Sequence, residues 1–191
     1  MNNTARPGKI IVLSGPSGVG KTTICHELMK RCKHLRYSTS ATSRPKRKGE
    51  KDGREYFFLT RTKFGEWIKK GWFVEYALVH GHLYGTPRIS LLKNIKKGRD
   101  VLMDVDVQGG RNLMKEFPDG IFIFILPPDF SELEKRLKGR NTEKRVEITD
   151  RLKRARQEIK YKRDYKYKIE NRNLKKTVEK IVKIIIKETT R

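Results

Sequence analysis

The chain has 191 residues, with 46 Lys or Arg against 22 Asp or Glu, so its formal net charge is +24. This length allows one domain, or one core with insertions, and neither a signal peptide nor an apolar run of membrane length is present, so we expect a cytoplasmic protein without membrane contact. The charge favours phosphate-rich partners, but much of it falls on lysines between Lys135 and Lys187, where solvated helix faces are the preferred explanation, so we expect no nucleic-acid binding.

The first predicted elements are a strand over Ile10–Ser14 and a helix over Thr22–Cys32, joined by a loop that reads G-x-x-x-x-G-K-T. Glycines let the backbone approach an anion closely, and the loop amides with the helix N-terminus form a nest for phosphate oxygens. Lys21 would reach the outer phosphates, and the Thr22 hydroxyl would hold Mg²⁺. We therefore predict a nucleoside triphosphate site made of Gly15, Pro16, Ser17, Gly18, Val19, Gly20, Lys21, Thr22 and Thr23.

Both cysteines, Cys25 and Cys32, fall in this first predicted helix, seven residues apart. That separation is about 10 Å along a helix, which is too far for a disulfide. The histidines, including the pair in His80-Gly81-His82, show no zinc-binding spacing with thiols or carboxylates. The sequence therefore predicts reduced thiols, as in a cytosolic protein, and no zinc site.

The next part of the chain, from about 37 to 88, holds several strands close together. The segments with extended or strand character are Arg36–Thr42, Glu55–Leu59 and Trp72–Val79, and a short helix is predicted near Thr62–Lys70. A basic, turn-rich loop separates the first two segments. Thr86 and Pro87 predict the start of a helix that Gly98 ends. Such crowded strands favour an inserted subdomain with a mixed or antiparallel sheet.

The remainder alternates strands and helices. The predicted strands are Val101–Asp106, Ile121–Leu126 and Tyr167–Asn171, and the helical apolar spacings run over about 148–159 and 174–185. Ile121–Leu126 is apolar throughout, which is typical of a strand buried on both faces of a parallel sheet. Ser131 and Glu134 predict a capping box at the start of another helix. We expect an α/β fold with a parallel core sheet flanked by helices.

One cluster beyond the glycine loop combines arginines with tyrosines, namely Arg44, Arg47, Tyr56 and Tyr84. Guanidinium forks hold phosphate through paired hydrogen bonds, and phenol hydroxyls can donate to its oxygens. These residues therefore suit a second phosphate group away from the glycine loop. From spacing alone, a solvated basic loop explains them equally well.

Two carboxylates, Asp104 and Asp106, end a predicted strand. They would face the same side if the strand continues that far, where one could assist Mg²⁺; hydrated strand-end residues are the alternative. Three arginines, Arg136, Arg140 and Arg151, lie in and beside a break between two predicted helices. They could close over transferring phosphates, although spacing alone favours a solvated helix face.

These stretches together resemble the guanylate kinase family. Residues 40–50 resemble its S-x-T-T/S-R-x-x-R-x-G-E motif, and residues 104–109 are similar to its D-I/V-D-x-Q-G motif. Residues 75–77 and 80–86 look like its E-Y/F-A and G-x-x-Y-G-T/S stretches, and the three arginines fall at its lid spacing. The resemblance runs from about residue 9 to residue 171.

The resemblance implies a single domain with the P-loop kinase fold. Its parts would be a core at about 8–36, 89–128 and 156–191, a GMP-binding insertion at about 37–88 and a small helical lid at about 129–155. It implies transfer of the γ-phosphoryl group of ATP to GMP, giving ADP and GDP, with Mg²⁺ as cofactor. It also leads us to expect dGMP as an acceptor and a monomer or homodimer.

By position, the resemblance also assigns roles to individual residues. The GMP phosphate would be held by Arg44, Arg47, Tyr56 and Tyr84, and the guanine side of the site would comprise Ser40, Glu75, Thr86 and Asp106. Carboxylates suit guanine, which offers donors at N1 and N2 where adenine offers no such pair. The donor side would comprise Lys21, Arg136, Arg140, Arg151 and Asn171, with Thr22 and Asp104 at the metal. Lys21, Arg44, Arg140 and Arg151 would be the catalytic residues.

The chain departs from the family pattern mainly on the donor side. Asn141 stands where the family has Gly, and the usual Y-D-Y-x-I/V-x-N-D-D stretch reads YKYKIENRN over residues 165–173, without its aspartates. Pro45 also sits one place earlier than in many members, and because the residue before a proline is held extended we expect little effect there.

Two other functions fit parts of the sequence. Some scaffold proteins carry guanylate-kinase-like modules that bind peptides without catalysis, but these typically have a degraded glycine loop, whereas residues 15–22 are complete. A basic ATPase acting on nucleic acid would fit the charge of +24. It would leave the clusters around Glu75 and Arg44 without a purpose.

Overall fold

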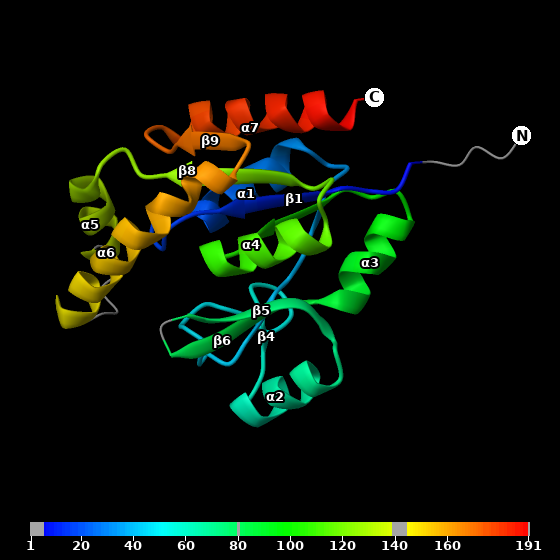
Figure 1. Ribbon diagram of the computed structural model, residues 1–191, viewed down its shortest axis with the longest axis horizontal. Coiled ribbons are helices and arrows are strands. Elements are labelled where there is room, and N and C mark those ends of the chain that lie inside the picture. The colour runs from blue at the N-terminus through cyan, green and yellow to red at the C-terminus, as the bar shows by residue number, and fades with distance from the viewer. Residues whose placement is uncertain (1–5, 80, 139–144, 191) are drawn as a thin grey trace, which may run out of the picture.

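A computed structural model of the chain describes residues 6–79, 81–138 and 145–190. Its centre is a five-stranded sheet in the order β2-β7-β1-β8-β9, in which every neighbouring pair is parallel (Figure 1). The strands are β1 (Ile10–Ser14), β2 (Arg36–Tyr37), β7 (Val101–Asp104), β8 (Ile121–Leu126) and β9 (Tyr167–Glu170). The predicted parallel α/β core is confirmed.

Helices cover both faces of this sheet because successive side chains of a strand point to opposite faces. Ile11 and Leu13 of β1 join a core cluster with α1 (Lys21–Arg31) and α7 (Leu174–Thr189). Ile10 and Val12 join a second cluster with α3 (Arg88–Lys96) and α4 (Val107–Glu116). Both faces of β1 and β8 are therefore buried, which explains why these strands are apolar at nearly every position. Among the described residues, no helix is long and apolar enough to cross a membrane.

A second, four-stranded sheet packs on the α4 side of the core (Figure 1). Its order is β4 (Phe57–Phe58), β3 (Ala41–Thr42), β6 (His82–Pro87) and β5 (Phe73–Val79). The β3–β4 pair is parallel, whereas β3–β6 and β5–β6 are antiparallel, so this sheet is mixed, as expected. The helix α2 (Arg61–Lys69) closes its small core, where the rings of Phe64 and Phe73 stack 4.5 Å apart.

Two features of this sheet differ from the sequence expectation. The extended segment Arg36–Thr42 is not one strand, because β2 pairs with β7 of the core while β3 pairs with β6 of the second sheet. Strand β6 was not predicted, since its glycine and proline are typical of turns. Gly85 is needed there for packing, because a Cβ at this position would lie 2.9 Å from the Phe73 ring. Pro87 ends β6 and is the N-cap of α3, so this helix begins at Arg88, one residue later than expected.

The predicted strand ending in Asp104 and Asp106 is also shorter than expected. Strand β7 stops at Asp104, and Asp106 is the N-cap of α4, where its carboxylate accepts a hydrogen bond from the Gly109 amide at 2.6 Å. The two carboxylates therefore do not share a strand, and α4 itself was not predicted. Two adjacent glycines lower the intrinsic helix propensity of this segment, so its sequence does not indicate a helix. Burial of one face of α4 against the sheet supplies the stability that the propensity lacks.

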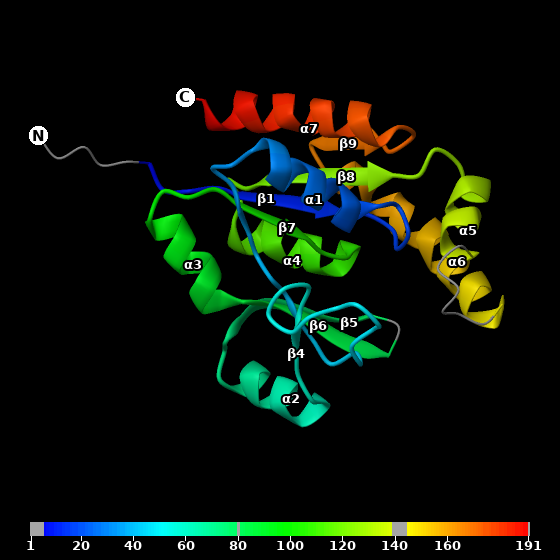
Figure 2. The same cartoon turned by 180° about the vertical axis from the view of Figure 1, so that it is seen from behind.

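The helices α5 (Phe130–Lys138) and α6 (Arg145–Ile159) lie beyond one end of the core sheet, as Figures 1 and 2 both show. A 3₁₀ segment, η1 (Lys160–Asp164), follows α6 and leads to β9. The start of α5 is capped by Asp129, which accepts from the Glu132 amide at 2.7 Å, so the predicted Ser131–Glu134 capping box is wrong. Ser131 instead donates its hydroxyl hydrogen bond to Asp129.

Candidate active site

A pocket of about 630 Å³ lies between the glycine loop and the second sheet. From the core it is lined by Lys21, Thr22, Thr23 and the loop glycines, and by Asp104, Asp106 and Arg151. From the second sheet and its loops it is lined by Ser40, Arg44, Arg47, Tyr56, Glu75 and Tyr84. The structure therefore brings together most of the site residues predicted from the sequence, although they come from distant parts of the chain.

The glycine loop depends on its glycines for its shape. Gly15, Gly18 and Gly20 have φ angles of 137°, 89° and 94°, a region that side chains disfavour. A Cβ at Gly15 would also lie 2.3 Å from the Ile125 carbonyl oxygen. Gly20 is the N-cap of α1 and contributes no side-chain cap, so the first amides of α1 are left for an anion.

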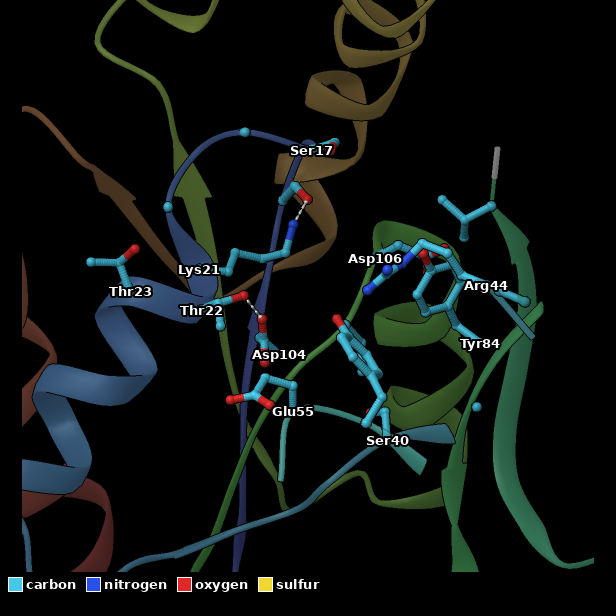
Figure 3. A pocket seen from close by; sticks show the side chains of 18 of the residues that line it. Ser17, Lys21, Thr22, Thr23, Ser40, Arg44, Glu55, Tyr84, Asp104 and Asp106 are labelled. Atoms are coloured by element: carbon cyan, nitrogen blue, oxygen red, sulfur yellow. Dashed lines mark hydrogen bonds between the residues drawn. The ribbon is translucent and has the colours of Figure 1, made fainter. Parts of the chain in front are cut away.

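Lys21 lies over this loop and points into the pocket (Figure 3). Its ammonium donates to the Gly15 carbonyl at 2.6 Å and to the Pro16 carbonyl at 3.1 Å. These backbone oxygens hold the amine close to the loop amides that would surround a phosphate. A phosphate there would offer the ammonium stronger, charge-assisted partners than neutral carbonyls.

Asp104, at the end of β7, forms hydrogen bonds with residues of both α1 and β2. The Thr22 hydroxyl donates to one carboxylate oxygen at 2.7 Å, and the Tyr37 hydroxyl donates to the other. Burial raises the pKa of Tyr37 above its usual value, so this phenol stays protonated and remains a donor. Tyr37 was missed in the sequence, where the one available signal was a hydroxyl-bearing aromatic residue at the end of an extended segment.

Within the arginine cluster, Arg47 is exposed, but Arg44 does not lie in the solvated loop that spacing alone allowed. Arg44 is only 9% exposed, and its guanidinium lies 5.6 Å from the Tyr56 ring and 5.7 Å from the Phe58 ring. Glu50 accepts from both of its terminal nitrogens, at 3.0 Å and 2.8 Å, and also from the Arg47 amide at 2.7 Å. Glu50 thus fixes one edge of the fork, a role that the sequence did not reveal although the residue lies in the quoted motif.

Figure 3 shows Ser40, Arg44 and Tyr84 facing Lys21, Thr22 and Asp104 across the pocket. The Tyr84 and Tyr56 rings meet edge to face, with centroids 5.9 Å apart. The side of the pocket formed by the second sheet therefore presents a held guanidinium and two phenols. Such a set is suited to a phosphate group.

The carboxylates of Glu75, Asp106 and Glu158 also line the pocket. Glu75 is 7% exposed and accepts from the Thr86 hydroxyl at 2.7 Å, while Thr86 itself is fully buried. Burial raises the pKa of Glu75 to about 7, opposed by the Thr86 hydrogen bond and assisted by the charge of Asp106. Burial also raises the pKa of Asp106 and of Glu158, a residue of α6 that the sequence did not suggest.

Glu75 and Asp106 approach one another across Gly109. A Cβ on this glycine would lie 2.6 Å from Glu75 Oε2 and 3.2 Å from Asp106 Oδ1. A buried acceptor such as Glu75, with a half-buried carboxylate converging on the same place, is costly without a ligand because it loses water. The two carboxylates are suited to a ligand edge that carries neighbouring hydrogen-bond donors.

Part of the predicted site faces a second cavity, of about 310 Å³, on the other side of the glycine loop. Arg136 and Asn171 line it. The side-chain amide of Asn171 donates to the Val19 carbonyl at 2.8 Å. The backbone carbonyl of Asn171 accepts from the Arg136 guanidinium at 3.1 Å. Arg140 and Asn141 lie outside the described residues.

The residues at Asp104 fit the chemistry of Mg²⁺, which prefers a few hard oxygen ligands from protein together with phosphate oxygens and water. The Thr22 hydroxyl and the Asp104 carboxylate are such ligands and already lie within hydrogen-bond distance of each other. Among the described residues, no group of three or more His, Cys, Asp or Glu could hold a metal by itself. Any metal at this place would thus rely on a bound phosphate.

Comparison with known proteins gives a consistent result. A family model described as guanylate kinase matches residues 7–188. The guanylate kinase of Caldanaerobacter subterraneus subsp. tengcongensis is 46% identical over 186 residues, which are 97% of this chain and 90% of that protein. The guanylate kinase of Thermotoga maritima is 41% identical over 95% of this chain and 87% of that protein. The crystal structure of guanylate kinase from Anaplasma phagocytophilum matches with a TM-score of 0.83 and 34% identity, over 97% of this chain and 88% of that chain.

Proposed function

The chain belongs to the guanylate kinase family, and we propose how its larger pocket transfers the γ-phosphoryl group of ATP to GMP, giving ADP and GDP. The observation that carries the proposal is that two separate sets of residues suited to phosphate line the same pocket. The complete glycine loop lies on one wall, the buried Arg44 lies on the facing wall, and Glu75 and Asp106 line the same pocket. One wall thus suits the donor and the other the acceptor.

On the donor side, the loop amides and Lys21 bind the β- and γ-phosphates of ATP. Lys21 leaves the carbonyls of Gly15 and Pro16 for the phosphate oxygens. Thr22 and Asp104 would hold Mg²⁺, which when bound with ATP neutralises charge on the phosphates. The Tyr37 hydroxyl keeps the Asp104 carboxylate turned toward Thr22.

On the acceptor side, Arg44, Arg47, Tyr56 and Tyr84 bind the GMP phosphate, and Ser40, Glu75 and Asp106 bind the guanine edge. Thr86 fixes Glu75 by its hydrogen bond. An oxygen of the GMP phosphate is the nucleophile, so no general base is needed. Catalysis is then positioning and charge stabilisation of an in-line transfer.

The arginines beyond the glycine loop complete the donor side. Arg151 on α6 lines the pocket, and we propose that it contacts the transferring phosphates together with Arg140, with Arg136 beside the donor base. We also propose the division into core, GMP-binding insertion and lid, closure of the lid against water, activity with dGMP, a monomeric or homodimeric state and a cytoplasmic location.

The acceptor specificity tests this function directly. In a coupled assay of ADP release, GMP and dGMP should be used as acceptors, and AMP, CMP and UMP should give less than about 1% of the GMP rate, since a buried acceptor pair left unmatched discriminates by 10⁴-fold or more in favourable cases. Activity with AMP in place of GMP would exclude the roles of Glu75 and Asp106. ATP hydrolysis that depends on added RNA instead of GMP would favour a nucleic-acid-dependent ATPase.

Substitution of Gly109 tests the convergence of the two carboxylates. In Gly109→Ala the new Cβ would displace the Glu75 carboxylate, which lies 2.6 Å from it, so we expect the KM for GMP to rise about tenfold, as for loss of one hydrogen bond to a charged group. The KM for ATP should stay the same. Gly65→Ala in α2 is the matched control, because a Cβ there meets nothing within 4 Å. Equal KM values for GMP in the two variants would contradict the proposed guanine site.

A further inference from the structure

The second cavity lies where the base of the donor nucleotide would extend from the glycine loop. It shares Gly18, Gly20 and Thr23 with the larger pocket, so a nucleotide whose phosphates occupy the loop can reach it. The remaining lining residues are Arg136, Asn171, Arg172 and Leu174. None of these lining residues carries a carboxylate, whereas two carry guanidinium groups.

The hydrogen bonds within the cavity decide what its side chains offer to a base. Arg136 is held by Glu132 at 3.0 Å and by the Asn171 carbonyl at 3.1 Å. Asn171 is 7% exposed, and its amide nitrogen donates to the Val19 carbonyl, so the group it offers to a ligand is its side-chain oxygen, an acceptor. Arg172 uses its Nε for Glu170, at 2.9 Å, and its side chain is 73% exposed. The two terminal nitrogens of Arg172 can therefore turn to a ligand in the cavity.

The chemistry of these groups fits guanine at least as well as adenine. Guanine presents O6 and N7 as neighbouring acceptors, which an arginine fork binds with two hydrogen bonds. Adenine presents N7 beside the N6 amine, and the amine is a donor that no guanidinium can satisfy. The Asn171 oxygen can accept from either purine.

We propose that this cavity accepts guanine as well as adenine, so that the protein also uses GTP as a phosphoryl donor. In the reaction, a phosphate oxygen of GMP forms a bond to the γ-phosphorus of GTP, and the bond from that phosphorus to the β–γ bridging oxygen breaks. GTP and GMP thus give two molecules of GDP, with no oxidant, reductant or further reactant. The inference rests on the proposed function, since the acceptor is the same GMP site.

The test compares ATP and GTP as donors to isotopically labelled GMP. Mass spectrometry then separates labelled GDP, formed from GMP, from unlabelled GDP, formed from GTP. We expect kcat/KM for GTP to lie within about tenfold of the value for ATP. In Arg172→Asp the ratio of ATP to GTP in kcat/KM should rise by about tenfold or more, mainly through the KM for GTP, because one bidentate base contact is lost.

Lys175→Asp provides the matched control. It makes the same change of charge three residues further on, at an exposed position that lines neither cavity, and it should leave the donor ratio unchanged. A GTP rate below about 1% of the ATP rate would overturn the inference and leave the proposed function intact. An equal loss for both donors in Arg172→Asp would show that Arg172 acts on phosphate charge, and would overturn its role at the base. Lack of activity with ATP and GMP would instead contradict the proposed function itself.

Discussion

Replacing Lys21 by alanine should lower kcat by about 10³-fold and change the KM for GMP by less than about threefold. Lys21 is the residue of the glycine loop whose ammonium is placed to reach the transferring phosphate, and loss of one preorganised charge at a developing anion costs about 10²–10³-fold or more. GMP binds on the facing wall, at Arg44 and Glu75, so its affinity should be nearly unaffected. Steady-state kinetics with either substrate varied measure both effects.

The control for this prediction is Lys30→Ala in the same helix. Lys30 forms an exposed ion pair with Glu27, and such pairs contribute only about 0.2–1 kcal/mol, so turnover should not change. Thermal unfolding of the Lys21 variant should resemble that of the parent, because hydrogen bonds from its amine to the neutral Gly15 and Pro16 carbonyls contribute little to stability. Near-normal turnover of Lys21→Ala would contradict the proposed catalytic role of Lys21 in the glycine loop.

The glycine loop shows how far local sequence determines a site. The strand, loop and helix around residues 15–22 are contiguous, and each follows from its own composition: apolar, glycine-rich and amphipathic. The same holds for β8, whose apolar character requires burial on both faces. Such elements could be predicted because the physical cause of each lies within a few residues.

The parts that could not be predicted depend on contacts between distant segments. Gly85 is typical of a turn, and only the nearby Phe73 ring explains a glycine inside strand β6. Tyr37 and Asp104 are 67 residues apart, and their hydrogen bond requires the parallel pairing of β2 with β7. Asp106 was predicted as a strand residue but is the N-cap of α4, because the start of this helix is decided by burial of the whole helix.

The guanine side of the site also depends on contacts between distant segments. Of the changes on that side, we expect protonation or substitution of Glu75 to lower kcat/KM for GMP the most. Guanine N1 and N2 donate, so Glu75 must be ionised to accept, but burial raises its pKa to about 7 in the empty pocket. Between pH 8 and pH 6 the proton increasingly occupies the carboxylate, and kcat/KM for GMP should fall about tenfold, while the KM for ATP changes little. Glu75→Gln should lower kcat/KM for GMP by about 10²-fold, since its amide would set a donor against a donor.

The GMP phosphate also titrates near pH 6, and Glu75→Gln separates the two titrations. Any dependence on pH that remains in this variant belongs to the phosphate, to Asp106 and to Glu158. If the parent and Glu75→Gln had the same pH profile, Glu75 would not be the group that binds guanine. Glu75→Gln should keep kcat at saturating GMP closer to the parent value than kcat/KM.

The same raised pKa predicts that Glu75 costs stability. A carboxyl group with a folded pKa of about 7 and an ordinary value of 4.5 binds more protons in the folded state, so between these pH values folding stability falls as the pH rises. Above pH 7 the cost amounts to a few kcal/mol at most. Glu75→Gln should therefore unfold several degrees higher than the parent at pH 8 and at nearly the same temperature at pH 4.5. A variant that is both more stable and less active with GMP would show that the buried charge is kept for guanine binding, whereas a lower unfolding temperature at pH 8 would contradict that explanation.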